Sequence, residues 1–156
     1  MRLYFLRHGH AEDGADDHAR QLTRDGAQRV VIAAKVMVKM DIKPKAIFSS
    51  PRVRARQTAE IVAEELGLIV DIREEVNFDF DVPKIKTLIA PHGDHDDLMF
   101  VGHEPTLSLA VMDLTGGNVE MKKGGLAMVE LTSRDPLRGM LVWLIAPRVF
   151  EAAYDF

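Results

Sequence analysis

Arg7 and His8 follow directly after an apolar run near the start of this 156-residue chain. The run, residues 3–6, is continuous rather than alternating, which is typical of a strand buried on both faces. Loops that follow such strands carry the reactive side chains of many α/β folds. An unprotonated imidazole can attack phosphorus, and a fixed guanidinium can hold two phosphate oxygens. The pair therefore suits phosphoryl transfer, although Arg-His-Gly alone is also compatible with a solvated loop that carries one positioning arginine.

Three further motifs accompany Arg7-His8-Gly9. They are LTRDG at 22–26, SSPRVRARQT at 49–58 and VGHEP at 101–105. In order and spacing, the set resembles the histidine phosphatase superfamily, the RHG group that includes phosphoglycerate mutases, and within it the short SixA-type phosphohistidine phosphatases. The resemblance covers nearly the whole chain. It implies an α/β fold of three layers, phosphoglycerate mutase-like, with a mainly parallel central sheet flanked by helices.

The resemblance also implies which side chains are catalytic: Arg7, His8, Arg54 and His103. His8 is the expected nucleophile, with its Nδ1 tied to a carbonyl of Gly9 or a neighbour so that Nε2 faces phosphorus. Arg7, Arg54 and His103 are expected to bind the substrate by surrounding the oxygens of the transferring phosphoryl group.

Neighbours of Arg54 compete for its role. Arg52 and Arg56 lie two positions away on either side, and a helix turns each by about 200° relative to Arg54. We therefore expect both to face solvent, with Arg52 still able to reach a protein substrate at the rim of the site. Ser50 either hydrogen-bonds near the pocket or caps the following helix.

The general acid is the least determined part of the site. Glu75, Asp79 and Asp81 are the candidates for protonating a leaving oxygen. A phosphohistidine substrate needs such an acid less, because imidazole is a better leaving group than an alkoxide. The segment between the second expected helix and the third buried strand is short and offers little chain for a lid. We therefore expect a phosphohistidine-bearing protein as partner, such as a histidine phosphotransfer domain or a phosphotransferase-system protein.

Three other interpretations remain open. The same His8 could serve a small-molecule phosphatase or mutase acting on a sugar phosphate or nucleotide. A non-catalytic phosphate-binding module is a further alternative, against which the intact catalytic residues count. The segment 92–97 (HGDHDD) offers metal ligands but reads as an ordinary turn, and Arg7 disfavours a cation beside His8. We expect no metal and no cofactor.

Composition narrows the class of protein. The formal net charge of −4 and the pI near 5.8 give no overall attraction for nucleic acid or an anionic membrane. Cysteine is absent, which excludes thiol nucleophiles and disulfides. The amino-terminal apolar run is far shorter than the roughly 20 residues of a membrane span and carries motif residues rather than a cleavage site. We expect a cytoplasmic protein with a single domain over residues 1–156.

Periodicity and turn residues predict alternating strands and helices, with a polar loop over 10–22 and no clear period over 74–80. Thr23 is the expected cap of the first helix and Gly67 the end of the second. The last two strands are expected to pair as a hairpin around residues 133–138. The predicted strands are 3–6, 46–48, 68–72, 98–101, 126–131 and 139–145, and the predicted helices are 24–40, 51–66, 82–90 and 106–114.

Overall fold

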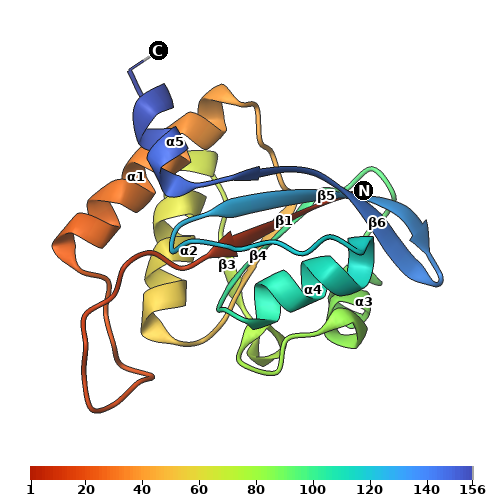
Figure 1. Cartoon of the computed structure of the whole chain (residues 1–156), viewed down its shortest axis with the longest axis horizontal. Coiled ribbons are helices and arrows are strands. Elements are labelled where there is room, and N and C mark those ends of the chain that lie inside the picture. The colour runs from red at the N-terminus through yellow and green to blue at the C-terminus, as the bar shows by residue number, and fades with distance from the viewer. Residues whose placement is uncertain (156) are drawn as a thin grey trace.

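The computed structural model describes residues 1–155, which form one six-stranded sheet with helices on both faces (Figure 1). In chain order the elements are β1 (Arg2–Arg7), α1 (Arg24–Lys39), β2 (Ala46–Ser49), α2 (Val53–Leu66), β3 (Val70–Ile72), the 3-10 turn η1 (Glu74–Val76), α3 (Val82–Ile89), β4 (Leu98–Gly102), α4 (Thr106–Thr115), β5 (Leu126–Arg134), β6 (Leu137–Ile145) and α5 (Pro147–Ala153).

The sheet has the order β3-β2-β4-β1-β5-β6. The first four strands in this order run parallel, β5 is antiparallel to β1, and β6 is antiparallel to β5. The expected three-layer, mainly parallel α/β fold is confirmed. In a parallel sheet the carboxyl ends of neighbouring strands meet at one edge, so β1, β2 and β4 deliver their following residues to the same place.

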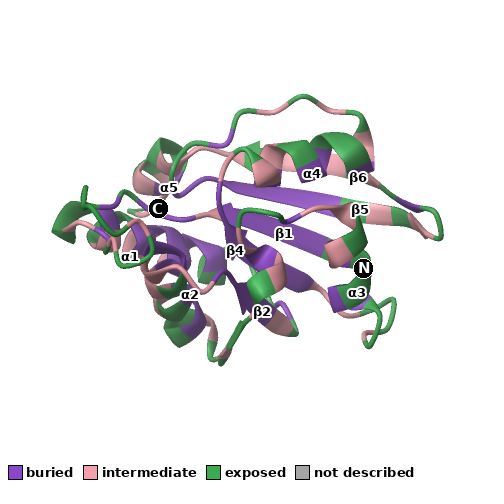
Figure 2. Ribbon diagram, turned by 90° about the horizontal axis from the view of Figure 1, so that it is seen from below, coloured by how far each residue is buried: buried purple, intermediate pink, exposed green. Residues whose placement is uncertain are grey.

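The core is divided into two layers by the sheet (Figure 2). One face packs against α3 and α4, and Phe5, Phe48 and Phe100 form its aromatic centre, with stacked neighbouring rings at 5.6 Å between centroids. The other face packs against α1, α2 and α5. The four residues after Arg2 in β1 are all buried, because their side chains meet both layers. This burial makes β1 a rigid support for the residues at its end.

Most predicted elements are confirmed, and the differences lie where hydrophobic periodicity is weak. Strand β3 is shorter than predicted, α2 begins two residues after Pro51, and the segment after residue 73 forms only the single turn η1. The helix α5, which begins at Pro147, was not predicted. No helix within residues 1–155 is both long and apolar enough to cross a lipid bilayer.

The polar loop over 10–22 is anchored at both ends beside β1. Thr23 caps α1 as predicted, accepting from the amide of Gly26 at 2.9 Å, and its own amide donates to the carbonyl of His10. A Cβ on residue 26 would lie 2.2 Å from that carbonyl oxygen, so only glycine allows this approach. The loop therefore returns to the sheet edge at which β1 ends.

Candidate active site

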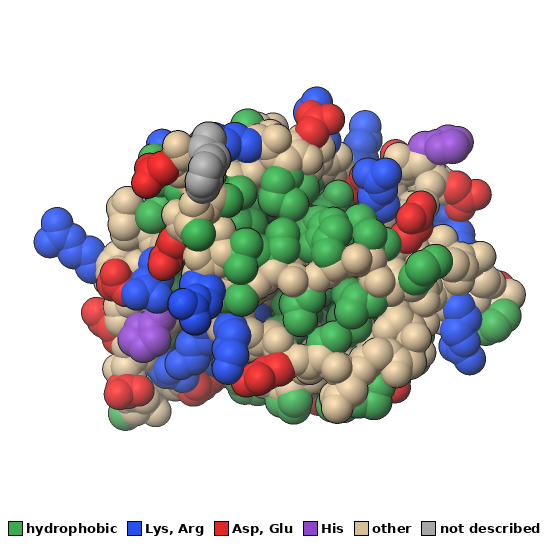
Figure 3. Space-filling model, turned by 45° about the horizontal axis from the view of Figure 1, so that its top comes forward, with side chains coloured by type: hydrophobic (Ala, Val, Ile, Leu, Met, Phe, Trp, Pro, Cys, Tyr) green, Lys and Arg blue, Asp and Glu red, His purple; other side chains and the backbone are tan. Residues whose placement is uncertain are grey.

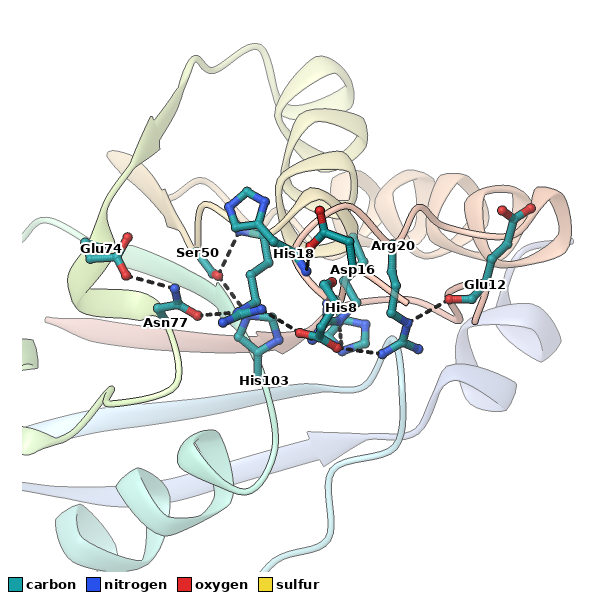
Figure 4. Close-up of polar contacts among 12 residues, drawn as sticks. His8, Glu12, Asp16, His18, Arg20, Ser50, Glu74, Asn77 and His103 are labelled. Atoms are coloured by element: carbon teal, nitrogen blue, oxygen red, sulfur yellow. Dashed lines mark hydrogen bonds and ion pairs between the residues drawn. The ribbon is translucent and has the colours of Figure 1, made fainter. Parts of the chain in front are cut away.

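Four side chains expected from the sequence converge at the carboxyl ends of β1, β2 and β4. His8 follows β1 and His103 follows β4, and the amide of His8 donates to the carbonyl of Gly102 at 3.1 Å. The two imidazole rings lie 5.3 Å apart between centroids (Figure 4). Arg54, in the first turn of α2, donates from Nε towards His8 Nε2 at 3.4 Å. Residues far apart in the chain thus form one compact site.

Hydrogen bonding fixes the tautomer of His8. Its Nδ1 lies 2.7 Å from the carbonyl oxygen of Gly9, as predicted, and because a carbonyl only accepts, Nδ1 carries the proton. Burial lowers the pKa of His8 to about 4, with the charges of Arg54 and Arg7 acting in the same direction against the hydrogen bond to Gly9. The ring is therefore neutral near pH 7, with an unprotonated Nε2 facing the site.

His103 is held by Ser50. Its Nε2 lies 2.7 Å from Ser50 Oγ, which also accepts from the amide of Arg52 at 3.2 Å. Because Ser50 Oγ already accepts from the Arg52 amide, we assign its hydroxyl as the donor to His103 Nε2, which places the ring proton of His103 on Nδ1. Burial lowers the pKa of His103 to about 3, with the nearby His8 and Arg54 acting in the same direction. Ser50 thus lies in the site, as one of its two predicted roles has it, whereas the alternative role as helix cap is wrong, because Arg52 is the N-cap of α2 and no side chain within residues 1–155 caps that helix.

The two arginines are each fixed by a carbonyl. Arg7 donates from one terminal nitrogen to the carbonyl of Met121 at 2.8 Å, and Arg54 does the same to the carbonyl of Asp17. Arg54 also forms an ion pair with the Asp17 carboxylate, at 3.3 Å. Burial lowers the pKa of both guanidiniums, yet both remain cationic at neutral pH, because arginine is not deprotonated in proteins. Two oriented cations therefore flank the His8 ring.

Two polar atoms in this cluster have no hydrogen-bond partner in the protein. Within residues 1–155, Arg7 Nε and His103 Nδ1 are the only buried side-chain nitrogen or oxygen atoms without one. A buried donor left unpaired costs roughly 1–3 kcal/mol, so folded proteins rarely keep one without a use. Two unpaired donors therefore lie beside the unprotonated Nε2 of His8. This arrangement suits a bound anion such as a phosphoryl group, with its oxygens at the donors and its phosphorus within reach of Nε2.

Comparison with known proteins agrees with this chemistry. The model of the histidine phosphatase superfamily (branch 1) matches residues 3–78, which include Arg7, His8 and Arg54. An uncharacterized protein of Picosynechococcus sp. is 32% identical over 149 residues, which cover 81% of this chain and 82% of that protein. The chain belongs to the histidine phosphatase superfamily.

The name SixA recurs among the matches within the superfamily. The phosphohistidine phosphatase SixA of Escherichia coli strain K12 is 24% identical over 152 residues, which cover 94% of each protein. The structure of the protein histidine phosphatase SixA complexed with tungstate has a TM-score of 0.86 and 25% identity, and covers 96% of this chain and 99% of that chain. The fold is thus that of the SixA structure, and the match extends over nearly all of both chains.

Arg52 does not face solvent, contrary to the prediction. Its side chain is only 19% exposed, because Nε donates to Asn77, a terminal nitrogen pairs with Asp17, and the guanidinium lies 3.8 Å from the centre of the Phe78 ring. Arg56 is exposed as predicted and pairs with Glu60. Helix α2 begins only after Arg52, so the helical rotation that turns Arg56 outward does not apply to Arg52.

Phe78 and Asp17 are site residues that the sequence did not reveal. Phe78 is 46% exposed, and its ring meets that of His103 at 4.8 Å with an edge-on angle of 73°. Asp17 bonds Arg20, Arg52 and Arg54, and these contacts outweigh the effect of its partial burial, so the pKa of its carboxyl lies below the ordinary value. Both residues come from segments without hydrophobic periodicity. The only signals in the sequence were the excess of acidic residues in the segment of Asp17 and the aromatic residues in the segment of Phe78.

Within residues 1–155, none of the three candidate acids forms a hydrogen bond or ion pair with Arg7, His8, Arg54 or His103. Glu75 receives both hydrogen bonds of the Arg73 fork at 3.2 Å, which lower the pKa of its carboxyl. Asp81 caps α3 by accepting from the amide of Lys84 at 3.1 Å. Asp79 is exposed and, together with Glu75, lines a groove of about 490 Å³ that Arg52 and Phe78 also line. Two of the three carboxyls are therefore engaged by other groups, while Glu75 and Asp79 share a groove with Phe78, which contacts His103.

No metal site accompanies this cluster. Within residues 1–155 no three His, Cys, Asp or Glu side chains are grouped so that they could hold a metal ion. The turn over 92–97 precedes β4, at the end opposite His103, and its groups bond one another and Arg134. The donors around His8 include two guanidiniums, which suit an anion and repel a cation.

Proposed function

We propose that this protein is a phosphatase that removes the phosphoryl group from phosphohistidine on a partner protein, by way of a phosphohistidine formed at its own His8. The observation that carries the proposal is the arrangement around His8 Nε2, which is unprotonated and lies beside two buried, unpartnered donors. SixA, with which this chain shares its fold, is a phosphohistidine phosphatase by name and has been crystallised with tungstate, an oxyanion.

The reaction has two displacements at phosphorus. His8 Nε2 attacks the phosphoryl group, its P–N bond forms, and the bond to the substrate nitrogen breaks with the electron pair remaining on the substrate imidazole. When the other nitrogen of that imidazole already carries a proton, the ring leaves neutral. Water then attacks phosphorus, the electron pair returns to His8 Nε2, and the protons of water pass to phosphate and solvent. Arg7, Arg54 and His103 bind the equatorial oxygens throughout.

The surroundings of the site favour a phosphohistidine over a phosphate ester. Loss of an alkoxide needs a proton donor at the leaving oxygen, whereas two of the three candidate carboxyls, Glu75 and Asp81, are engaged by other groups. The exposed ring of Phe78 beside His103 offers an aromatic wall on which a leaving imidazole can pack. A site that only binds phosphate would not need an imidazole kept neutral and oriented.

A substrate panel tests this function. Purified protein and the His8→Ala variant are incubated with free phosphohistidine, a phosphorylated histidine phosphotransfer domain, a phosphoserine peptide and 3-phosphoglycerate, and phosphate release is measured. We expect release from the phosphohistidine substrates that is lost in the variant. Faster His8-dependent turnover of the esters would assign the protein to the metabolite-directed phosphatases instead. Absence of any His8-dependent release would leave a binding module.

A further inference from the structure

A second groove begins one residue from the nucleophile. Its volume is about 750 Å³, and it runs between α1, the segment before β5 and the start of α5. Arg7 lines its inner end, whereas His8, Arg54 and His103 do not line it. Apolar side chains on the α1 side and at the start of α5, including Val30, Ala33 and Pro147, form part of its wall. The groove therefore offers an apolar surface that extends from the catalytic site.

The charged side chains of this groove are mainly cationic. Five cationic residues line it against the acids Asp25 and Glu120, in a chain whose net charge is −4. Figure 3 shows Lys and Arg side chains gathered in one region of the molecular surface, next to hydrophobic ones. The groove is thus locally positive on a protein that is negative overall, so an acidic ligand is attracted to this region rather than to the surface at large.

Two of the cations are available to a ligand. Arg29 pairs with Asp25 and Glu151, and Lys122 pairs with Glu120. The side chains of Lys123 and Arg148, both exposed, form no hydrogen bond or ion pair within residues 1–155. They come from different segments, one before β5 and one in α5. The positive charge of Lys123 also reaches the His8 ring, where it contributes to the lowered pKa.

We infer that this groove docks an acidic segment of the partner protein that flanks its phosphorylated histidine, with carboxylates meeting Lys123 and Arg148 and an apolar side chain meeting the wall. The inference rests on the proposed function and adds the chemistry of the partner. Because the groove starts at Arg7, a chain whose phosphohistidine reaches His8 can continue directly into it. Charges at the rim of such a surface act mainly on the association rate and on the choice of partner.

Two synthetic peptides of equal length test the inference. Both contain one phosphohistidine, flanked by Glu in one peptide and by Lys in the other, and free phosphohistidine serves as the reference substrate. The variant is Arg148→Glu. The matched control is Arg138→Glu, an exposed arginine of β6 that pairs in register with Ser133 at the far end of the sheet. Binding without turnover is read by fluorescence anisotropy of the labelled peptides on His8→Ala protein.

We expect kcat/KM for the Glu-flanked peptide to exceed that for the Lys-flanked one by about fivefold to tenfold in 50 mM salt, and by much less in 500 mM salt. Arg148→Glu should remove most of this preference, with free phosphohistidine turned over as in the wild type, and Arg138→Glu should keep it. Equal use and equal binding of the two peptides, or equal effects of both variants, would overturn the docking groove. Failure to turn over free phosphohistidine, both peptides and a phosphorylated histidine phosphotransfer domain would refute the proposed function. The difference in anisotropy between the two peptides would still show whether the groove prefers the acidic one.

Discussion

Lowering the pH from 7.5 to 5.5 should leave the attack by His8 almost unchanged. An ordinary histidine, with a pKa of 6.5, would be only about 9% neutral at pH 5.5. Burial lowers the pKa of His8 to about 4, so that about 97% of the ring is still neutral at that pH. The attacking species therefore differs about tenfold between the two cases. Because the pKa of His8 is lowered, the ring becomes protonated, and so loses its nucleophilic nitrogen, only at a more acidic pH than an ordinary histidine.

The assay is the rate of phosphoryl transfer to His8 as a function of pH, measured under single-turnover conditions. The phosphate group of a substrate titrates near pH 6, so two substrates with different phosphate pKa values are compared. If the pH midpoint of the rate is the same for both substrates, it reflects a titrating group of the enzyme and not the phosphate group of the substrate. Circular dichroism at each pH confirms that the protein remains folded over the range used.

We expect the enzyme-dependent part of kcat/KM to be flat from pH 7.5 to 5.5 and to halve near pH 4. A substrate-independent midpoint near 6.5, with a tenfold fall by pH 5.5, would show that His8 is not desolvated as the structure has it.

Other substitutions test single contacts of the site. Ser50→Ala removes the partner of His103 Nε2, a loss of about 1–1.5 kcal/mol, so kcat/KM should fall about tenfold with the fold retained, and unchanged kinetics would exclude this positioning role. Asp17→Asn removes an ion pair to Arg54 but keeps the 2.8 Å bond to the backbone carbonyl, so kcat/KM should change less than about fivefold, unlike the loss of about 100-fold or more expected for Arg54→Ala. Glu75→Gln should leave phosphohistidine turnover within twofold of wild type, and a fall of tenfold or more would identify this carboxyl as the acid.

The central part of the fold was predictable because its strands are buried on both sides. Residues 3–6 and 98–101 form continuous apolar runs, and both runs end in a histidine motif. Parallel pairing of such strands brings their ends together, and the structure joins His8 to the carbonyl of Gly102. The helix caps were also predictable from local sequence, since Thr23 lies at the start of α1 and Gly67 at the end of α2, as predicted.

The rim of the site was not predictable, because tertiary contacts determine it. Arg52 resembles Arg56 in sequence but is withdrawn from solvent by Asp17 and Phe78, which come from two segments without periodicity. Helix α5 is short and follows a long hairpin, so seven residues gave too little pattern for a prediction. The second groove depends on the same helix, and no local motif indicated it.

Trapping the phosphorylated enzyme tests the account most directly. Protein mixed with phosphohistidine substrate is quenched within milliseconds, digested at alkaline pH and analysed by mass spectrometry and ³¹P NMR. Because Nδ1 of His8 is bound to the Gly9 carbonyl at 2.7 Å, we expect the phosphoryl group on His8 and on its Nε2. Phosphate on Nδ1, on another residue, or released without any protein-bound intermediate would contradict the mechanism.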